Sequence, residues 1–93
     1  MNLRKLRHEL SGEISLSSVI GALIFGIRID ADLTQKGLSK LANVDIEVIH
    51  RLEGGSGVDT MDLDKVLKAL DVSKKELGYS IAQYMENYER QVK

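Results

Sequence analysis

The polar side chains that could do chemistry are gathered in residues 33–55, LTQKGLSKLANVDIEVIHRLEGG. Within this stretch Glu47, His50 and Arg51 supply a carboxylate, an imidazole and a guanidinium close together, and these groups hydrogen-bond and carry charge. No nucleophile–base pair, carboxylate dyad or metal cluster is evident in the sequence. We therefore expect a protein that recognises a partner, not an enzyme.

Residue types that bind metals are present but scattered. His8 and His50 are isolated, and the absence of cysteine removes the usual zinc sites. Asp59, Asp62 and Asp64 have side chains that calcium prefers, but no EF-hand glycine or terminal glutamate follows them. We expect no metal ion and no cofactor, and we interpret Asp59 or the residue after it as a helix cap.

Overall charge and hydropathy limit the class of protein. Fourteen acids and thirteen bases give a net charge of −1, whereas nucleic-acid affinity depends on Lys and Arg side chains that face phosphates. The longest apolar run, residues 19–27, is far below the ~20 residues that span a bilayer. The basic residues near Met1 are not followed by the pattern of a signal peptide. We expect one small cytoplasmic domain with no membrane contact and, at most, one locally basic face.

The distribution of apolar residues predicts an all-α chain. No proline occurs, and apolar residues recur at helical spacing between good helix formers. Helix-capping residues then predict helices that begin after Ser17 or Ser18, after Thr34, after Asp45, after Asp59 or Thr60, and at the capping box of residues 73–76. Gly78 is a weak point in the last helix, because glycine costs about 1 kcal/mol relative to alanine.

Three segments are expected. Residues 1–17, with leucines on one face and bases on the other, form an arm or a short amphipathic helix, and residues 18–77 form the main domain. Residues 78–93 continue the last helix as a dimerisation element. An apolar stripe on that helix is a partner surface, a dimer seam or part of the core, and it consists of Leu77, Ile81, Tyr84, Tyr88 and Val92.

The two short helices on either side of residues 43–45 have the arrangement of a helix-turn-helix. Small side chains, Ser39 and Ala42, would let the helices cross closely, and Ile49 would be buried between them. Such a pair of helices can present the first residues of its second helix to the major groove of DNA.

With these features in view, the sequence resembles the lambda-repressor-like (XRE/Cro-type) helix-turn-helix family over roughly residues 21–77. The pieces that match, in order, are GALIFGIR, LTQKGLSKLANV, DIEVIHRLEGG and LDKVLKALDVSKKEL. The fold that this resemblance implies is an all-α, five-helix bundle containing a helix-turn-helix, here with an extra N-terminal segment and an extended C-terminal helix. The resemblance also implies a structural salt bridge between Arg28 and Glu53.

The DNA-contacting positions of the family fall on particular residues of this chain. The resemblance implies that Gln35, at a helix start, touches a phosphate, and that Arg51 and Glu47 read guanine and cytosine. The full set that we expect to contact DNA is Thr34, Gln35, Lys36, Ile46, Glu47, Val48, His50 and Arg51. The chain departs from the family after residue 53, where GGSGVDTMDLD brings three aspartates and no base.

Two functions follow as expectations. The first is a sequence-specific regulator of transcription that binds double-stranded DNA as a homodimer, most simply a repressor of the phage-repressor or antitoxin type. The alternative is a protein–protein interaction module that kept the fold with weak or no DNA binding. Its partner would bind through the N-terminal segment or the C-terminal helix. Steep salt dependence of binding favours the first function, because it reports contacts with phosphates.

Overall fold

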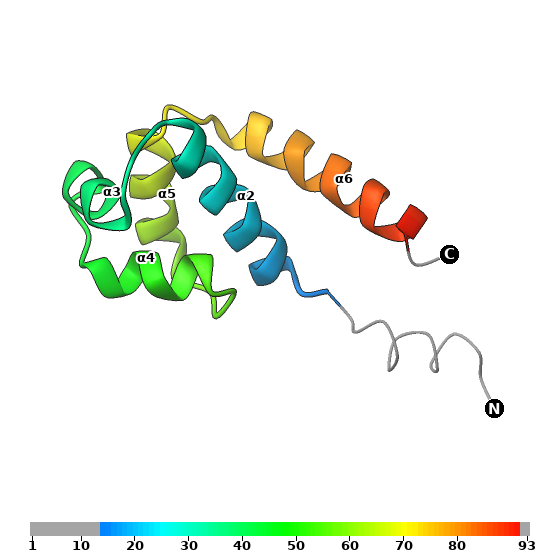
Figure 1. Cartoon of the computed structure of the whole chain (residues 1–93), viewed down its shortest axis with the longest axis horizontal. Coiled ribbons are helices and arrows are strands. Elements are labelled where there is room, and N and C mark those ends of the chain that lie inside the picture. The colour runs from blue at the N-terminus through cyan, green and yellow to red at the C-terminus, as the bar shows by residue number, and fades with distance from the viewer. Residues whose placement is uncertain (1–13, 92–93) are drawn as a thin grey trace.

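The computed structural model describes residues 14–91 of the chain, and these residues form five helices and no strand (Figure 1). The helices, labelled as in Figure 1, are α2 (Leu16–Asp30), α3 (Gln35–Ala42), α4 (Ile46–Glu53), α5 (Thr60–Ala69) and α6 (Lys74–Gln91). Helices α2 to α5 form a bundle, and α6 extends from it (Figure 1). The predicted all-α fold class is confirmed.

Polar side chains start four of the five helices. Thr34 Oγ1 accepts the Gly37 N–H at 2.9 Å, and Asp59 Oδ1 accepts the Asp62 N–H at 2.9 Å. Asp45 precedes α4 but makes no side-chain cap bond. The prediction that Ser17 or Ser18 caps α2 is wrong. Ser15 is the cap, because its Oγ accepts the Ser18 N–H at 3.1 Å and its carbonyl accepts the Val19 N–H. The helix therefore begins two or three residues earlier than expected.

Helices α2, α3 and α5 end in the same way. After α2, α3 and α5 the chain passes through Asp32, Asn43 and Asp71, each with φ between 57° and 59°. The next residue is apolar in every case, and its N–H donates to the carbonyl five residues earlier, as in Val44 to Ser39 at 3.1 Å. This is the Schellman arrangement. Asp and Asn enter the left-handed region more readily than other residues with a side chain, so three Asx residues fix three turns of the bundle.

The core lies among all five helices. Its fully buried members come from α2, α3, α4 and α5 and include Ile24, Leu38, Ile49 and Val66. Gly21 allows α2 to approach α4 closely, since a Cβ at this position would lie 2.3 Å from the Leu52 carbonyl oxygen. The contact between these two helices positions the helix-turn-helix on the rest of the bundle.

Helix α6 is continuous through Gly78, which is exposed and has open space around it. Leu77 is buried in the core, and Ile81 packs against the core from the next turn, so apolar contacts hold the helix on both sides of the glycine. Farther along, Tyr84 and Tyr88 are half-buried. Val92, the last residue of the expected stripe, lies outside the described residues, as do residues 1–13 of the expected N-terminal segment.

Candidate nucleic-acid interface

The turn between α3 and α4 is fixed by backbone geometry and one side chain. Asn43 adopts φ 57° and ψ 49°, and the Ser39 hydroxyl donates to the Val44 carbonyl at 2.6 Å. Ala42 is buried beside this turn. From the sequence, Ser39 was expected to matter only because its small side chain lets the two helices cross closely. In the structure its hydroxyl also ties α3 to the residue that follows the turn, which holds the two helices at one angle.

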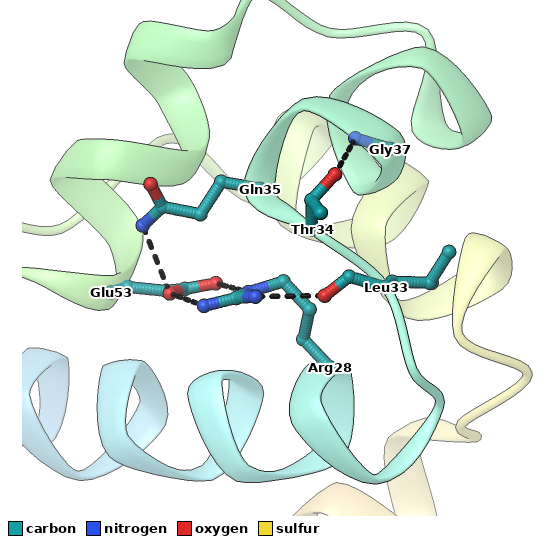
Figure 2. A network of polar contacts seen from close by, with 6 residues as sticks. All are labelled: Arg28, Leu33, Thr34, Gln35, Gly37 and Glu53. Carbon is teal, nitrogen blue, oxygen red and sulfur yellow. Dashed lines mark hydrogen bonds and ion pairs between the residues drawn. The ribbon is translucent and has the colours of Figure 1, made fainter.

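A buried polar network joins three helix ends (Figure 2). Arg28 donates from Nε to Glu53 Oε2 at 2.6 Å and from Nη2 to Oε1 at 2.9 Å, which is a two-pronged pair. Its Nη1 donates to the Leu33 carbonyl at 2.8 Å. Gln35 Nε2 donates to Glu53 Oε1 at 3.1 Å. The end of α2, the start of α3 and the end of α4 are therefore tied to one carboxylate.

The side chains of Arg28 and Glu53 are 7% and 5% exposed, so this ion pair, which the resemblance implied, is shielded from solvent. The hydrogen bond to Glu53 is the main cause that raises the pKa of Arg28 above its ordinary value, against the opposing effect of burial. The guanidinium carbon also lies 5.3 Å from the centre of the Phe25 ring, within the range of a cation–π contact. Each nitrogen of the Arg28 guanidinium thus has a hydrogen-bond partner, and the residue is structural.

The outer face of α4 carries the exposed members of the expected DNA-contacting set. Glu47, His50 and Arg51 are exposed, and Ile46 is 37% exposed at the first position of the helix. His50 Nδ1 lies 3.8 Å from Glu47 Oε1. One short helix therefore presents an apolar side chain, an acceptor, an imidazole and a guanidinium to solvent.

Val48 does not belong to this face. It is 7% exposed and lies on the inner side of α4 with Ile49 and Leu52. Val48 therefore packs with the bundle in this structure, and it is left out of the base-contacting set that we propose below. Helical spacing also places Val48 on the inner side of α4, since positions 48, 49 and 52 share one side of a helix.

The remaining expected phosphate ligands lie at the start of α3. Thr34 is exposed but uses its hydroxyl oxygen as the helix cap, and Lys36 is exposed. Lys40, which was not in the expected set, is also exposed and lies in the last turn of the same helix. Gln35 is half-buried, with its amide held by Glu53. The sequence did not indicate this bond, because the two residues are eighteen positions apart. The bond orients the Gln35 side chain beside α4.

Gly21 is a structural residue that was not expected from the sequence. A glycine within an apolar helix that must pack on another helix was a usable signal, since a glycine allows the two backbones to approach closely.

Among residues 14–91 no group of three His, Cys, Asp or Glu side chains could hold a metal ion. Over the same residues no helix is both long and apolar enough to cross a membrane.

Comparison with known proteins supports the fold. No protein-family model matches the chain, and no curated protein matches it. Among solved structures, the crystal structure of the wild-type restriction–modification controller protein C.Esp1396I is similar, with a TM-score of 0.71 and 26% sequence identity over 78% of this chain and 95% of that chain. The crystal structure of a mutant of the same controller protein is similar as well, with a TM-score of 0.72 and 26% identity over 78% of this chain and 94% of that chain.

Proposed function

We propose that this chain is a sequence-specific DNA-binding regulator of transcription that acts as a homodimer. One observation carries the proposal: Glu47, His50 and Arg51 project from the outer face of α4, and the end of this helix is tied to the start of α3 by the Gln35–Glu53 bond. The two helices are held rigidly by the turn at Asn43 and by the buried network around Glu53. A rigid pair of helices with polar groups on the second helix is what reading of the major groove requires.

Each exposed side chain of α4 has a distinct part in the proposal. Arg51 donates in a fork to guanine O6 and N7, and Glu47 accepts from cytosine N4. Ile46 packs on a thymine methyl group, and His50 meets the DNA backbone. A good two-pronged contact such as that of Arg51 discriminates against the wrong base by about 1–3 kcal/mol. Recognition therefore depends mainly on Arg51.

Phosphate contacts come from the start of α3. The Gln35 amide nitrogen carries two hydrogens, and Glu53 accepts one of them, which leaves the other for a phosphate oxygen. Lys36 and Lys40 add charge from the same helix. With so few bases on this face, one protomer would bind weakly and with a shallow salt dependence. A dimer doubles the number of contacts and places two α4 helices on half-sites about 34 Å apart.

The comparison supports a regulatory role. The similar protein C.Esp1396I is named a restriction–modification controller, and control of other genes is what a small DNA-binding dimer can provide. We propose repression as the mode, in the manner of phage repressors or antitoxins, because a dimer seated on a promoter excludes other proteins from it. Leu77 and Ile81 belong to the core, so the proposed dimer surface is the later part of the α6 stripe, around Tyr84 and Tyr88.

A second function is favoured by a separate observation. Phe25 and Ile29 are large apolar side chains about half-exposed on α2, and Asp30 and Asp32 lie beside them at the end of that helix. Acids at this place repel phosphates, so this part of α2 suits a protein partner better than DNA. The alternative is a protein–protein interaction module that uses this surface and binds DNA weakly or not at all.

Selection from a random duplex library at about 100 mM salt, where phosphate contacts still contribute strongly, separates the two functions. We expect a two-fold symmetric motif from the wild-type protein and none from Arg51→Ala. Arg90→Ala removes an equal charge from exposed α6 and is the matched control, which should select the same motif. A wild-type protein that enriches no sequence would overturn DNA reading and leave the interaction module.

A further inference from the structure

The outer face of α4 carries a pair of ionisable side chains that lie close to each other. His50 Nδ1 is 3.8 Å from Glu47 Oε1, three residues earlier on the same helix, and both side chains are exposed. Within residues 14–91 this is the only polar contact of the imidazole. The other ring nitrogen, Nε2, is therefore left for a partner outside the described part of the chain.

In the proposed complex His50 meets the DNA backbone, so its ring lies between two acceptors, the Glu47 carboxylate and a phosphate oxygen. A neutral imidazole has one N–H and one unprotonated nitrogen, whereas the protonated ring donates from both nitrogens. Whichever nitrogen carries the hydrogen, the neutral ring turns a lone pair toward one of the two anions. A second proton removes this repulsion and places a positive charge between two negative ones.

We propose that DNA binding by this chain is coupled to protonation of His50, which then bridges Glu47 and a phosphate. The inference rests on the proposed function, and in particular on the contact between His50 and the DNA backbone. A histidine side chain ordinarily changes its charge near pH 6.5. The affinity for DNA therefore rises as the pH falls through this range, because the complex holds more protons than the free protein.

Charged groups on the neighbouring helices make no ion pair with His50. α4 packs against α2 and α3, and α5 approaches it on the side of Val48 with Asp62 and Lys65. The charged residues of α2 and α3 are Arg28, Asp30, Lys36 and Lys40. Within residues 14–91 none of these groups pairs with His50. Its ion-pair partner is Glu47, on its own helix.

Arg51 is the charge on α4 that opposes protonation of His50. It follows His50 directly in the chain, and its guanidinium is always positive, so it repels a second cation. Two negative groups act in the other direction: Glu47, whose oxygen is 3.8 Å from the ring, and the phosphate in the complex. At comparable distances two anions outweigh one cation, so bound DNA favours the protonated ring.

The affinity for a fluorescent random-sequence duplex, measured between about pH 8 and about pH 5.5 at a constant salt concentration of about 100 mM, tests the coupling. One added charge about 4 Å from a phosphate changes affinity about fivefold per protomer, so the proposed dimer should bind at least about 25-fold more tightly at the lower pH. His50→Gln does not titrate and should lose this gain. The matched control is His8→Gln, which removes the other histidine of the chain and should keep the wild-type pH dependence.

Glu47→Gln tests the bridge itself. The new amide can donate to an unprotonated Nδ1, so a neutral ring can turn its N–H to the phosphate without repulsion from residue 47. One hydrogen bond contributes about twofold or more per protomer, so the gain on acidification should be at least about fourfold smaller for a dimer than in the wild-type protein.

The outcomes separate this coupling from the proposed function. Wild-type pH dependence in His50→Gln would overturn the coupling, and wild-type pH dependence in Glu47→Gln would overturn the bridge. Wild-type binding that does not change with pH would overturn both and leave DNA binding in place. A wild-type protein that binds no DNA at any pH would overturn the proposed function, and this inference with it.

Discussion

Arg28 Nε lies 2.6 Å from Glu53 Oε2, and this contact joins residues twenty-five positions apart in a nearly solvent-free site. Two further groups converge on the pair: the Leu33 carbonyl accepts from Arg28, and the Gln35 amide donates to Glu53. The start of α3 and the end of α4 thereby share one anchor on α2. The ion pair sets the geometry of the proposed interface without contacting DNA.

Glu53→Gln should lower the free energy of unfolding by about 3–5 kcal/mol, because it leaves the Arg28 charge buried without its partner. Chemical denaturation measures this loss. The control is Glu86→Gln, which breaks the exposed Glu86–Arg90 pair and should cost well under about 1 kcal/mol. Similar losses for the two variants would show that the Arg28–Glu53 pair is not shielded as the structure indicates.

Gly21→Ala should destabilise the protein by about 1–3 kcal/mol, the usual cost of overpacking. The new Cβ would lie 2.3 Å from the Leu52 carbonyl oxygen, and α2 would have to move away from α4. Gly26→Ala is a matched control on the same helix, since nothing lies within 4 Å of its Cβ. It should stabilise the protein by up to about 1 kcal/mol. Thermal unfolding of both variants checks the prediction, and equal shifts would contradict it.

The fold could be predicted because its signals are local. Caps and helix periods each involve residues within a few positions of one another, and the structure has the expected caps at Thr34, Asp59 and residues 73–76. The start of α2 was misplaced because three serines in the run SLSS compete for one role. Capping preferences cannot decide which of these serines caps the helix, since each hydroxyl could accept the same kind of hydrogen bond.

The candidate site was less predictable because its contacts are distant in sequence. The bond from Gln35 to Glu53 depends on how α3 meets α4, which no spacing rule gives. Val48 shows a different limit of prediction from the sequence. Its burial follows from the helical period shared with Ile49 and Leu52, but the family resemblance assigned it to the DNA-facing set. The helical period of the chain therefore predicts the burial of Val48, which the resemblance did not indicate.

Acidification should weaken the start of α6. The Ser73 backbone N–H donates to Glu76 Oε1 at 3.0 Å, and this bond, with that of the Ser73 hydroxyl, lowers the pKa of Glu76 from 4.5. A lowered pKa in the folded state means that the stabilisation is fully present above the unfolded pKa and is lost as pH falls through the folded value.

Amide exchange in the first turn of α6 should therefore speed up as the pH is lowered below about 4.5, after correction for the intrinsic pH dependence of exchange. Glu76→Gln keeps an acceptor at the same place but does not titrate. Its first turn should consequently show a flatter pH profile in this range. Identical profiles for the wild-type protein and Glu76→Gln would exclude Glu76 as the titrating group.

Glu47→Gln should change DNA binding in two opposite ways. Removing a negative charge about 6 Å from a phosphate relieves roughly 0.5–1 kcal/mol of repulsion, so affinity for random duplex DNA should rise about two- to fivefold. At the operator the same change replaces an acceptor for cytosine N4 with an amide that pairs with adenine N6 and N7. The selected motif should therefore change from cytosine to adenine at that position.

The matched control for Glu47→Gln is Asp71→Asn. It removes one negative charge at the turn between α5 and α6, and asparagine tolerates the left-handed conformation of that residue. This variant should retain both the wild-type motif and the wild-type affinity for random DNA. If Glu47→Gln binds random DNA more tightly without changing the motif, Glu47 lies near phosphates but reads no base. If neither property changes, α4 does not enter the groove with Glu47 facing the DNA.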